Sequence, residues 1–433
     1  MTITTEISEF TAGITSAAIP SPARRVLQLS LLDWMAVGIA GRDEPVAGIV
    51  RDVALAEGGV GAASVIGTQT RLPARAAALV NGTTSHALDY DDTHFAHIGH
   101  PSVVVIPAAL AMAQQVGVNG RALQEAALIG AEVSIRIGLW LGRGHYQVGY
   151  HQTATAGAFG AAMAAARVLG MDAAQCAQVL GVVATRASGL KSQFGTMGKP
   201  YNAGIAAANG VEAAILVNAG FEGRVDGIES ALGFGATHHG EGDMRALDGI
   251  GAAWVFESVS HKFHACCHGL HATLETAAGI DVAADDIAMI EVQTNPRWIG
   301  VCDQAAPMNG LGAKFSYATV LAMHYLGHRT GALGCYSDAI CARADVQALR
   351  ARVSVVANAD VAETAARLRI VVSDGSEHRG AYDLEAPMDI AARQAKVQAK
   401  AAVLLGADQA AACWTLVEGE AAPNEIGAAL TRS

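Results

Sequence analysis

The sequence predicts a mainly α protein built from two domains, a large helical domain and a smaller α+β domain. Three observations support this. Up to about residue 258, the apolar segments are long, rich in Ala and Gly, and free of the two-residue alternation typical of strands. After His261, short β-branched segments alternate with helical ones. The composition, 52% hydrophobic and 16% charged residues, is that of a folded chain with a large core.

The elements of the helical domain follow one another between turn residues. A first helix is expected from Ser21-Pro22, with Ser as the cap and Pro as the first helical residue, to Gly41. A short extended piece is expected at residues 64–67, and a helix at 72–88. Further helices are expected, in order, at residues 103–116, 121–141, 153–169, 173–187 and 201–219.

The smaller domain combines strands and helices. Segment 377–384 is expected to pair with the strand before it through a turn at Asp374-Gly375. The other strands are expected at 289–294, 353–357 and 368–372, the helices between them at 315–326 and 346–352, and a last helix at 391–405. The last helix could pack back on the first domain. The predicted domains are therefore residues 1–258 with 390–433, and residues 259–389.

Charge and cysteine content limit the class of protein. The net charge of −11 argues against a nucleic-acid-binding or polybasic membrane-binding surface, but it allows a small anionic substrate. The seven Cys form no CxxC pair, so free thiols in a reducing compartment are expected. We see no signal peptide and no uninterrupted apolar run of about 18 residues. A soluble cytoplasmic protein is the resulting prediction.

One polar stretch stands out between the apolar segments. Residues 86–102 read HALDYDDTHFAHIGHPS and contain three Asp, four His and one Thr. Such groups are costly to bury unless they are paired or used in function. Asp89, Asp91 and Asp92 could bind Mg²⁺ and a diphosphate, as in terpenoid synthases, or they could cap helices. The Mg²⁺ interpretation needs a second acidic motif, and the later acidic residues are scattered.

The same stretch contains three His at a spacing of three residues. His94, His97 and His100 could bind zinc together with a carboxylate. In the alternative, one of them is catalytic and the others are structural. Gly99 and Pro101 make a regular helix improbable there, so the spacing does not fix a common face.

Two later segments carry candidates for anion binding. His151 precedes an Ala/Gly-rich helix for which Thr153 is an available cap. Lys199 lies in FGTMGKP (194–200), where Pro200 can open a helix, so its ammonium and free N–H groups can bind a carboxylate or phosphate. The segment is not a Walker loop, because Lys199 is followed by Pro. A structural His and a solvated Lys are the alternatives.

Residues 261–271 form a further His- and Cys-rich segment. At helical spacing, one face would hold His264, Cys267, His268 and His271, which could bind a metal. No second Cys cluster supports an iron–sulfur centre.

Five motifs in this order resemble those of the MmgE/PrpD family, over nearly the whole chain. That family includes 2-methylcitrate dehydratase, cis-aconitate decarboxylase and iminodisuccinate epimerase. The motifs are LDYDDT (88–93) with HPS (100–102), GYHQT (149–153), GTMGKP (195–200), Lys262 with Cys266-Cys267 and His271, and AKFS (313–316).

The resemblance implies a helical domain that carries the site, an α+β lid that closes over it, a homodimer, and no metal or organic cofactor. It implies a small di- or tricarboxylate substrate. The implied catalytic residues are Asp89, His100, His151 and Lys199, and the implied substrate-binding residues are Thr93, Lys199, Lys262, His271 and Tyr317.

Chemistry agrees with these residue types. Lys199 and Lys262 can neutralise substrate carboxylates and the enolate-like charge that forms when an α-proton leaves. His100 and His151 can exchange protons near neutral pH, and which is the acid and which the base stays open. Asp89 could orient an imidazole. Thr93 would offer a hydroxyl to a carboxylate or leaving group.

Three departures from the family pattern leave the substrate open. Segment 263–265 reads FHA where prolines are usual, Asn202 stands where a His is common, and Thr319 replaces a Tyr, with Tyr317 nearby. The leading prediction is a cofactor-independent lyase that dehydrates a 2-methylcitrate-like substrate. A decarboxylase or an epimerase with the same site, a Mg²⁺-dependent terpenoid-type enzyme, and a non-enzymatic helical scaffold are the alternatives.

Overall fold

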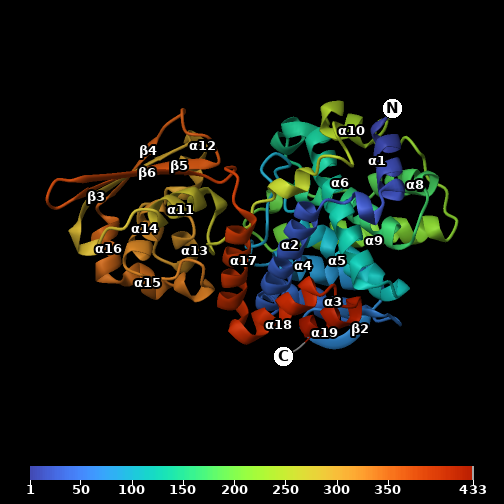
Figure 1. The fold of residues 1–433 in the computed structure, drawn as a ribbon, viewed down its shortest axis with the longest axis horizontal. Coiled ribbons are helices and arrows are strands. Elements are labelled where there is room, and N and C mark those ends of the chain that lie inside the picture. Colours follow the sequence, from blue (N-terminus) through green and yellow to red (C-terminus); the bar gives the residue numbers. More distant parts are fainter. Residues whose placement is uncertain (432–433) are drawn as a thin grey trace. The chain divides into compact units, whose positions relative to one another are not determined.

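The computed structural model describes residues 1–431 and divides them into two compact units. Unit 1 comprises residues 1–261 and 390–431, and unit 2 comprises Lys262–Asp389. Helices dominate unit 1, and unit 2 combines helices with a four-stranded sheet, so the mainly α prediction is confirmed (Figure 1). Among residues 1–431, no helix combines the length and hydropathy that crossing a membrane requires.

Unit 1 is built around α7 (Gln152–Val168), in which every residue except Arg167 is buried. Helices α5 (Ser102–Val116), α6 (Gly120–Gln147) and α9 (Gly198–Asn218) pack against α7, and α4 (Ala74–His86) packs against α5 and α9. A helix buried on all sides needs apolar residues around its whole circumference, which the sequence of α7 provides.

Small residues let these helices approach closely. A Cβ added to Gly130 of α6 would lie 2.5 Å from the carbonyl oxygen of Gly160 in α7, and the reverse distance is also 2.5 Å. A Cβ on Gly204 of α9 would lie 2.1 Å from Oγ1 of Thr83 in α4. The close packing of these helices explains why unit 1 is rich in Ala and Gly.

The remaining elements of unit 1 surround these helices. They are α1 (Ile3–Gly13), α2 (Ser21–Ala40), α3 (Pro45–Glu57), the antiparallel pair β1 (Ala63–Val65) and β2 (Thr68–Leu72), α8 (Ala173–Ala184), α10 (Phe234–Thr237), α17 (Ile390–Leu405), α18 (Ala407–Glu418) and α19 (Pro423–Thr431). Lys400 Nζ of α17 lies 2.6 Å from Asp33 Oδ1 of α2, and both side chains are buried. The prediction of Ser21 as a cap is wrong, because α2 begins at Ser21 and Pro20 holds the cap position.

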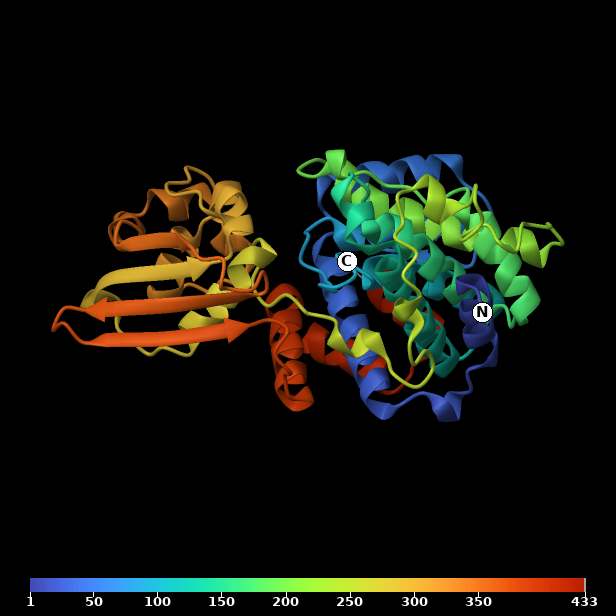
Figure 2. The ribbon, with the colours of Figure 1, turned by 90° about the horizontal axis from the view of Figure 1, so that it is seen from above.

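Unit 2 is organised on a sheet with strand order β4-β3-β5-β6 (Figure 2). The strands are β3 (Ile287–Thr294), β4 (Val353–Ala357), β5 (Ala365–Val372) and β6 (Glu377–Asp383), and only β3 and β4 are parallel. The helices are α11 (His271–Ala278), α12 (Pro296–Cys302), α13 (Gly310–Ala313), α14 (Tyr317–Tyr325), α15 (Asp338–Ala342) and α16 (Ala344–Arg350). Alternate residues of β5, including Leu368 and Ile370, are buried, and α11 packs against β5 and β6.

The predicted turn between β5 and β6 is confirmed. Ser376 N donates to Asp374 Oδ1 at 2.8 Å, and Gly375 has a φ of 88°, which favours glycine.

Candidate active site

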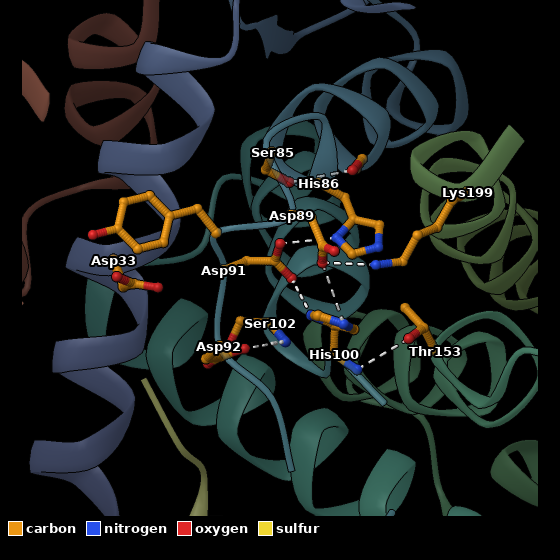
Figure 3. Close-up of polar contacts among 12 residues, drawn as sticks. Asp33, Ser85, His86, Asp89, Asp91, Asp92, His100, Ser102, Thr153 and Lys199 are labelled. Atoms are coloured by element: carbon orange, nitrogen blue, oxygen red, sulfur yellow. Dashed lines mark hydrogen bonds and ion pairs between the residues drawn. The ribbon is translucent and has the colours of Figure 1, made fainter. Parts of the chain in front are cut away.

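The polar stretch 86–102 connects the end of α4 to the start of α5. Its backbone is irregular, since Asp89 and Ile98 have φ angles of 50° and 54°. Such left-handed conformations are uncommon outside glycine and often mark functional positions. Thr93 is fixed by two backbone bonds with Ser260, at 2.9 and 2.7 Å. The loop is thus held in a definite shape that directs its side chains (Figure 3).

Asp91 bridges two histidines at the centre of the loop. His86 Nδ1 lies 2.8 Å from Asp91 Oδ1, and His100 Nδ1 lies 2.7 Å from Asp91 Oδ2. Burial raises the pKa of the Asp91 carboxyl, but the attraction and hydrogen bonds of the two imidazoles outweigh burial and hold its pKa well below the usual range. The carboxylate is therefore charged and orients both rings. Sequence reasoning assigned no role to His86, and its place at the edge of the polar stretch was the available signal.

Asp89 faces Lys199 on the more open side of this cluster. Lys199 Nζ lies 2.7 Å from Asp89 Oδ1, and His100 Nε2 lies 3.7 Å from the same oxygen (Figure 3). The Asp89 side chain is 50% exposed. Lys199 is in the first turn of α9, and its ammonium also lies over the Phe194 ring at 5.4 Å. The structure thus brings Asp89, His100 and Lys199 together, as their implied roles require.

His151 occupies the cap position of α7. The helix begins at Gln152, so the prediction of Thr153 as the cap is wrong; Thr153 Oγ1 instead accepts from the backbone N–H of His100 at 3.1 Å. His151 Nδ1 lies 3.3 Å from Asn202 Nδ2. Burial, and next the positive charge of Lys199, hold the pKa of His151 well below its usual range. His151 is therefore neutral at physiological pH.

Asp92 has a different task from its neighbours. It accepts from Ser102 N at 3.3 Å and from Ser102 Oγ at 2.5 Å, so it caps the start of α5 as the capping alternative expected. Burial is the main cause that raises the pKa of Asp92 to about 7. Asp91, for which capping was also considered, bridges the two imidazoles instead.

The three evenly spaced histidines have different partners. His94 Nε2 lies 2.8 Å from Ser258 Oγ, and burial lowers its pKa to about 4. His97 is fully buried, burial lowers its pKa to about 3, and its ring packs against Gly138, where an added Cβ would lie 1.9 Å from His97 Cδ2. Only His100 meets Asp91, so the zinc set that the spacing suggested does not form.

A different set of residues has metal-ligand spacing. One ligand atom from each of His86, Asp89, Asp91 and His100 lies within 4.8 Å of the others. This donor set is already paired, because Asp91 lies between two imidazole nitrogens and Lys199 Nζ contacts Asp89. A cation there would have to displace an ammonium and separate a carboxylate from its two partners. The cluster suits anion binding and proton transfer better than metal binding.

The remaining candidates belong to unit 2. His271 Nε2 lies 3.3 Å from the Cys266 carbonyl oxygen, and the Tyr317 hydroxyl donates to the Gly269 carbonyl oxygen at 2.9 Å. Both side chains are buried. Their substrate-binding roles, and those of Lys262 and Thr93, stay predictions.

The metal face considered as one possibility for residues 264–271 is absent from the described part of the chain. Among residues 1–431, the only group of three or more His, Cys, Asp or Glu side chains with ligand atoms within 4.8 Å of one another is the cluster around Asp91. The Sγ atom of Cys267 instead lies 3.4 Å from the Sγ atom of Cys302.

Comparison with known proteins agrees with the motif order. The MmgE/PrpD N-terminal domain model matches residues 5–246, and the C-terminal domain model matches residues 259–418. The chain is 26% identical over 348 residues to a cis-aconitate decarboxylase of Aspergillus terreus, covering 74% of this chain and 71% of that one. It is 32% identical over 171 residues to the human cis-aconitate decarboxylase, covering 38% and 35% of the two chains.

Proposed function

We propose that this chain, which belongs to the MmgE/PrpD family, is a lyase that moves a proton at a carbon next to a carboxylate of a small polycarboxylate. The observation that carries the proposal is the cluster in which a buried Asp91 orients His86 and His100 beside the Asp89–Lys199 pair. A charged lysine, oriented imidazoles and a solvent-accessible carboxylate together fit an anionic substrate that exchanges a proton.

Binding begins at Lys199 in this proposal. A substrate carboxylate replaces Asp89 as the partner of the ammonium, at the positive end of the α9 helix dipole. Asp89 is half-exposed, so its carboxylate can move into water at little cost. The cation then lies where it stabilises the negative charge that builds on the substrate carboxylate as the C–H or C–C bond breaks.

Decarboxylation of a cis-aconitate-like substrate is the first reaction to test, because the relatives named above are cis-aconitate decarboxylases. In that reaction a carbon–carbon bond breaks, CO₂ leaves, the electron pair enters the conjugated carboxylate system, and a proton is added to carbon. Dehydration of a 2-methylcitrate-like substrate would remove the α-proton and expel the β-hydroxyl as water. Epimerisation would remove and return one proton. All three share the proton transfer.

The experiment is proton exchange in D₂O, followed by NMR. The panel is cis-aconitate, citrate, 2-methylcitrate and an aspartate-derived dicarboxylate. CO₂ release with deuterium in the product identifies a decarboxylase, loss of water a dehydratase, and inversion without elimination an epimerase. Exchange with none of them would refute the proposal.

Variants and chelation separate the proposal from its alternatives. Lys199→Ala is expected to abolish exchange, whereas the matched control Lys191→Ala should keep it, because Lys191 Nζ donates to the Tyr146 carbonyl oxygen at 3.0 Å. Loss of activity in EDTA would favour the Mg²⁺-dependent alternative. Wild-type behaviour of both Lys199→Ala and His100→Ala would favour the scaffold alternative.

A further inference from the structure

The two histidines of the site have opposite kinds of partner at Nδ1. His100 Nδ1 lies 2.7 Å from a carboxylate oxygen of Asp91, whereas His151 Nδ1 lies 3.3 Å from the amide nitrogen of Asn202. A carboxylate only accepts a hydrogen bond, and an amide nitrogen only donates one. His100 must therefore carry its proton on Nδ1, and neutral His151 must carry its proton on Nε2.

The orientation of the Asn202 amide is determined by a second contact. Asn202 Nδ2 also lies 3.3 Å from the carbonyl oxygen of Leu190. A carbonyl oxygen cannot donate, so rotating the amide by 180° would bring two oxygens together and lose the bond to Leu190. Asn202 is buried, so the loss of that bond would be costly. The amide nitrogen is thus kept toward His151.

The orientation of Asp91 is determined in a similar way. Its other oxygen lies 2.8 Å from His86 Nδ1, and the His86 and Asp91 side chains are 0% and 1% exposed. Both carboxylate oxygens are therefore occupied, and the group cannot rotate without breaking one contact. His86 thereby keeps Oδ2 of Asp91 aligned with His100.

We propose that Asp91 and Asn202 are positioning residues: each fixes the tautomer of one histidine, and the division of roles between His100 and His151 follows from the two tautomers. Once the substrate has displaced Asp89, whose carboxylate lies 3.7 Å from His100 Nε2, His100 takes and returns the proton at carbon through the unprotonated Nε2. His151 stays neutral and donates a hydrogen bond from Nε2–H to the substrate oxygen on which negative charge builds. This division rests on the proposed function, and it assigns the acid and base roles that the sequence left open.

The electrostatic surroundings of each ring agree with its proposed role. The buried Asp91 carboxylate stabilises the imidazolium that forms when His100 accepts a proton, as in a catalytic triad. His151 lies at the start of α7 and near Lys199, and both disfavour a positive charge on this ring. A neutral imidazole that donates a hydrogen bond to a developing oxyanion is a known way to stabilise an enolate.

Tautomers can be measured without any reaction. The full chain, labelled with ¹⁵N-histidine, is studied by long-range ¹⁵N–¹H correlation NMR, which reports which ring nitrogen carries the proton. His100→Gln and His151→Gln spectra assign the two signals. We expect a proton on Nδ1 of His100 and on Nε2 of His151. The same tautomer in both rings would overturn the proposal.

The substitution Asn202→Asp tests the division of roles. It changes one atom of the amide and offers only acceptors, so His151 should move its proton to Nδ1 and lose its donor at Nε2. We expect kcat to fall about 10²- to 10³-fold, the cost of removing one oxyanion donor, with a much smaller change in KM. The control is Asn209→Asp on the same helix, where the side chain contacts Arg186, and it should keep wild-type kcat.

The outcomes separate the two proposals. An unchanged kcat in Asn202→Asp, with the proton of His151 moved to Nδ1, would refute the division of roles while the lyase proposal survives. If the tautomers are as expected but the wild type processes no member of the polycarboxylate panel, the lyase proposal fails and the division of roles fails with it. If Asn202→Asp leaves His151 protonated on Nε2, Asn202 does not position the ring, and the proposal is wrong.

Discussion

Replacing Asp92 by Asn is expected to make unit 1 more stable than the wild type above pH 7, but not near pH 4. Asp92 caps α5, which begins two residues after His100, so this perturbation lies next to the candidate site. Burial is the main cause that raises the pKa of Asp92 from 3.8 to about 7, and the nearby Asp33 raises it further. An Asn side chain can accept from Ser102 N and stays neutral at every pH.

The direction in which stability changes with pH follows from the raised pKa of Asp92. In the folded chain, Asp92 keeps its proton up to about pH 7, whereas in the unfolded chain it ionises near 3.8. The stability that Asp92 contributes is therefore fully present below pH 3.8 and is lost as the pH rises to 7. A difference of about 3 pKa units corresponds to about 4 kcal/mol. Relative to the wild type, Asp92→Asn should gain about this much free energy of unfolding between pH 4 and pH 8.

Hydrogen–deuterium exchange of peptides from α5, corrected for the intrinsic exchange rate at each pH, measures this free energy without requiring the two units to unfold together. Subtracting the wild-type values cancels every other group that titrates. The control is Asp43→Asn, whose wild-type side chain is 86% exposed, and it should give no pH-dependent difference. A constant difference between Asp92→Asn and the wild type from pH 4 to pH 8 would refute the reasoning.

Three further predictions concern activity and packing. Asp91→Asn should lower kcat about 10²- to 10⁴-fold, because the amide can donate to His100 and displace the proton from Nδ1. Steady-state kinetics measure this effect, and a wild-type kcat would contradict the prediction. Lys400→Met should lower the free energy of unfolding by about 3–5 kcal/mol, because it removes the ammonium that pairs with the buried Asp33 carboxylate. Denaturant unfolding measures this loss, and the double variant Lys400→Met/Asp33→Asn checks whether neutralising Asp33 restores stability. Gly204→Ala should lower the free energy of unfolding by about 1–3 kcal/mol, because the added Cβ would lie 2.1 Å from Thr83 Oγ1. The control Gly13→Ala adds a Cβ in open space and should lower it less. Equal melting temperatures for the two variants would argue against close packing of α4 and α9.

Local patterns predicted the main elements of the fold. The apolar period of helices such as α5 and α7, and the β-branched runs of β3, β4 and β5, depend only on neighbouring residues. The elements that were missed include α1, α3, α18 and β2. Strand β2 reads TQTRL and is mostly exposed, so no apolar alternation marks it. Its partner β1 decides its conformation.

For the candidate site, too, the sequence identified the residue types and the tertiary structure decided their contacts. Side-chain types and motif order, read from the chain alone, identified Asp89, His100, His151 and Lys199 as a group, since charged and titratable residues are unusual among apolar segments. The tertiary structure decided which of them touch. It paired Asp91 with His86 and His100, brought Asn202 to His151 across 51 positions, and left His94 and His97 in the core. Contacts between distant residues depend on helix packing, and a hydrogen-bond partner fixes a tautomer only once that packing has brought the two groups within about 3 Å.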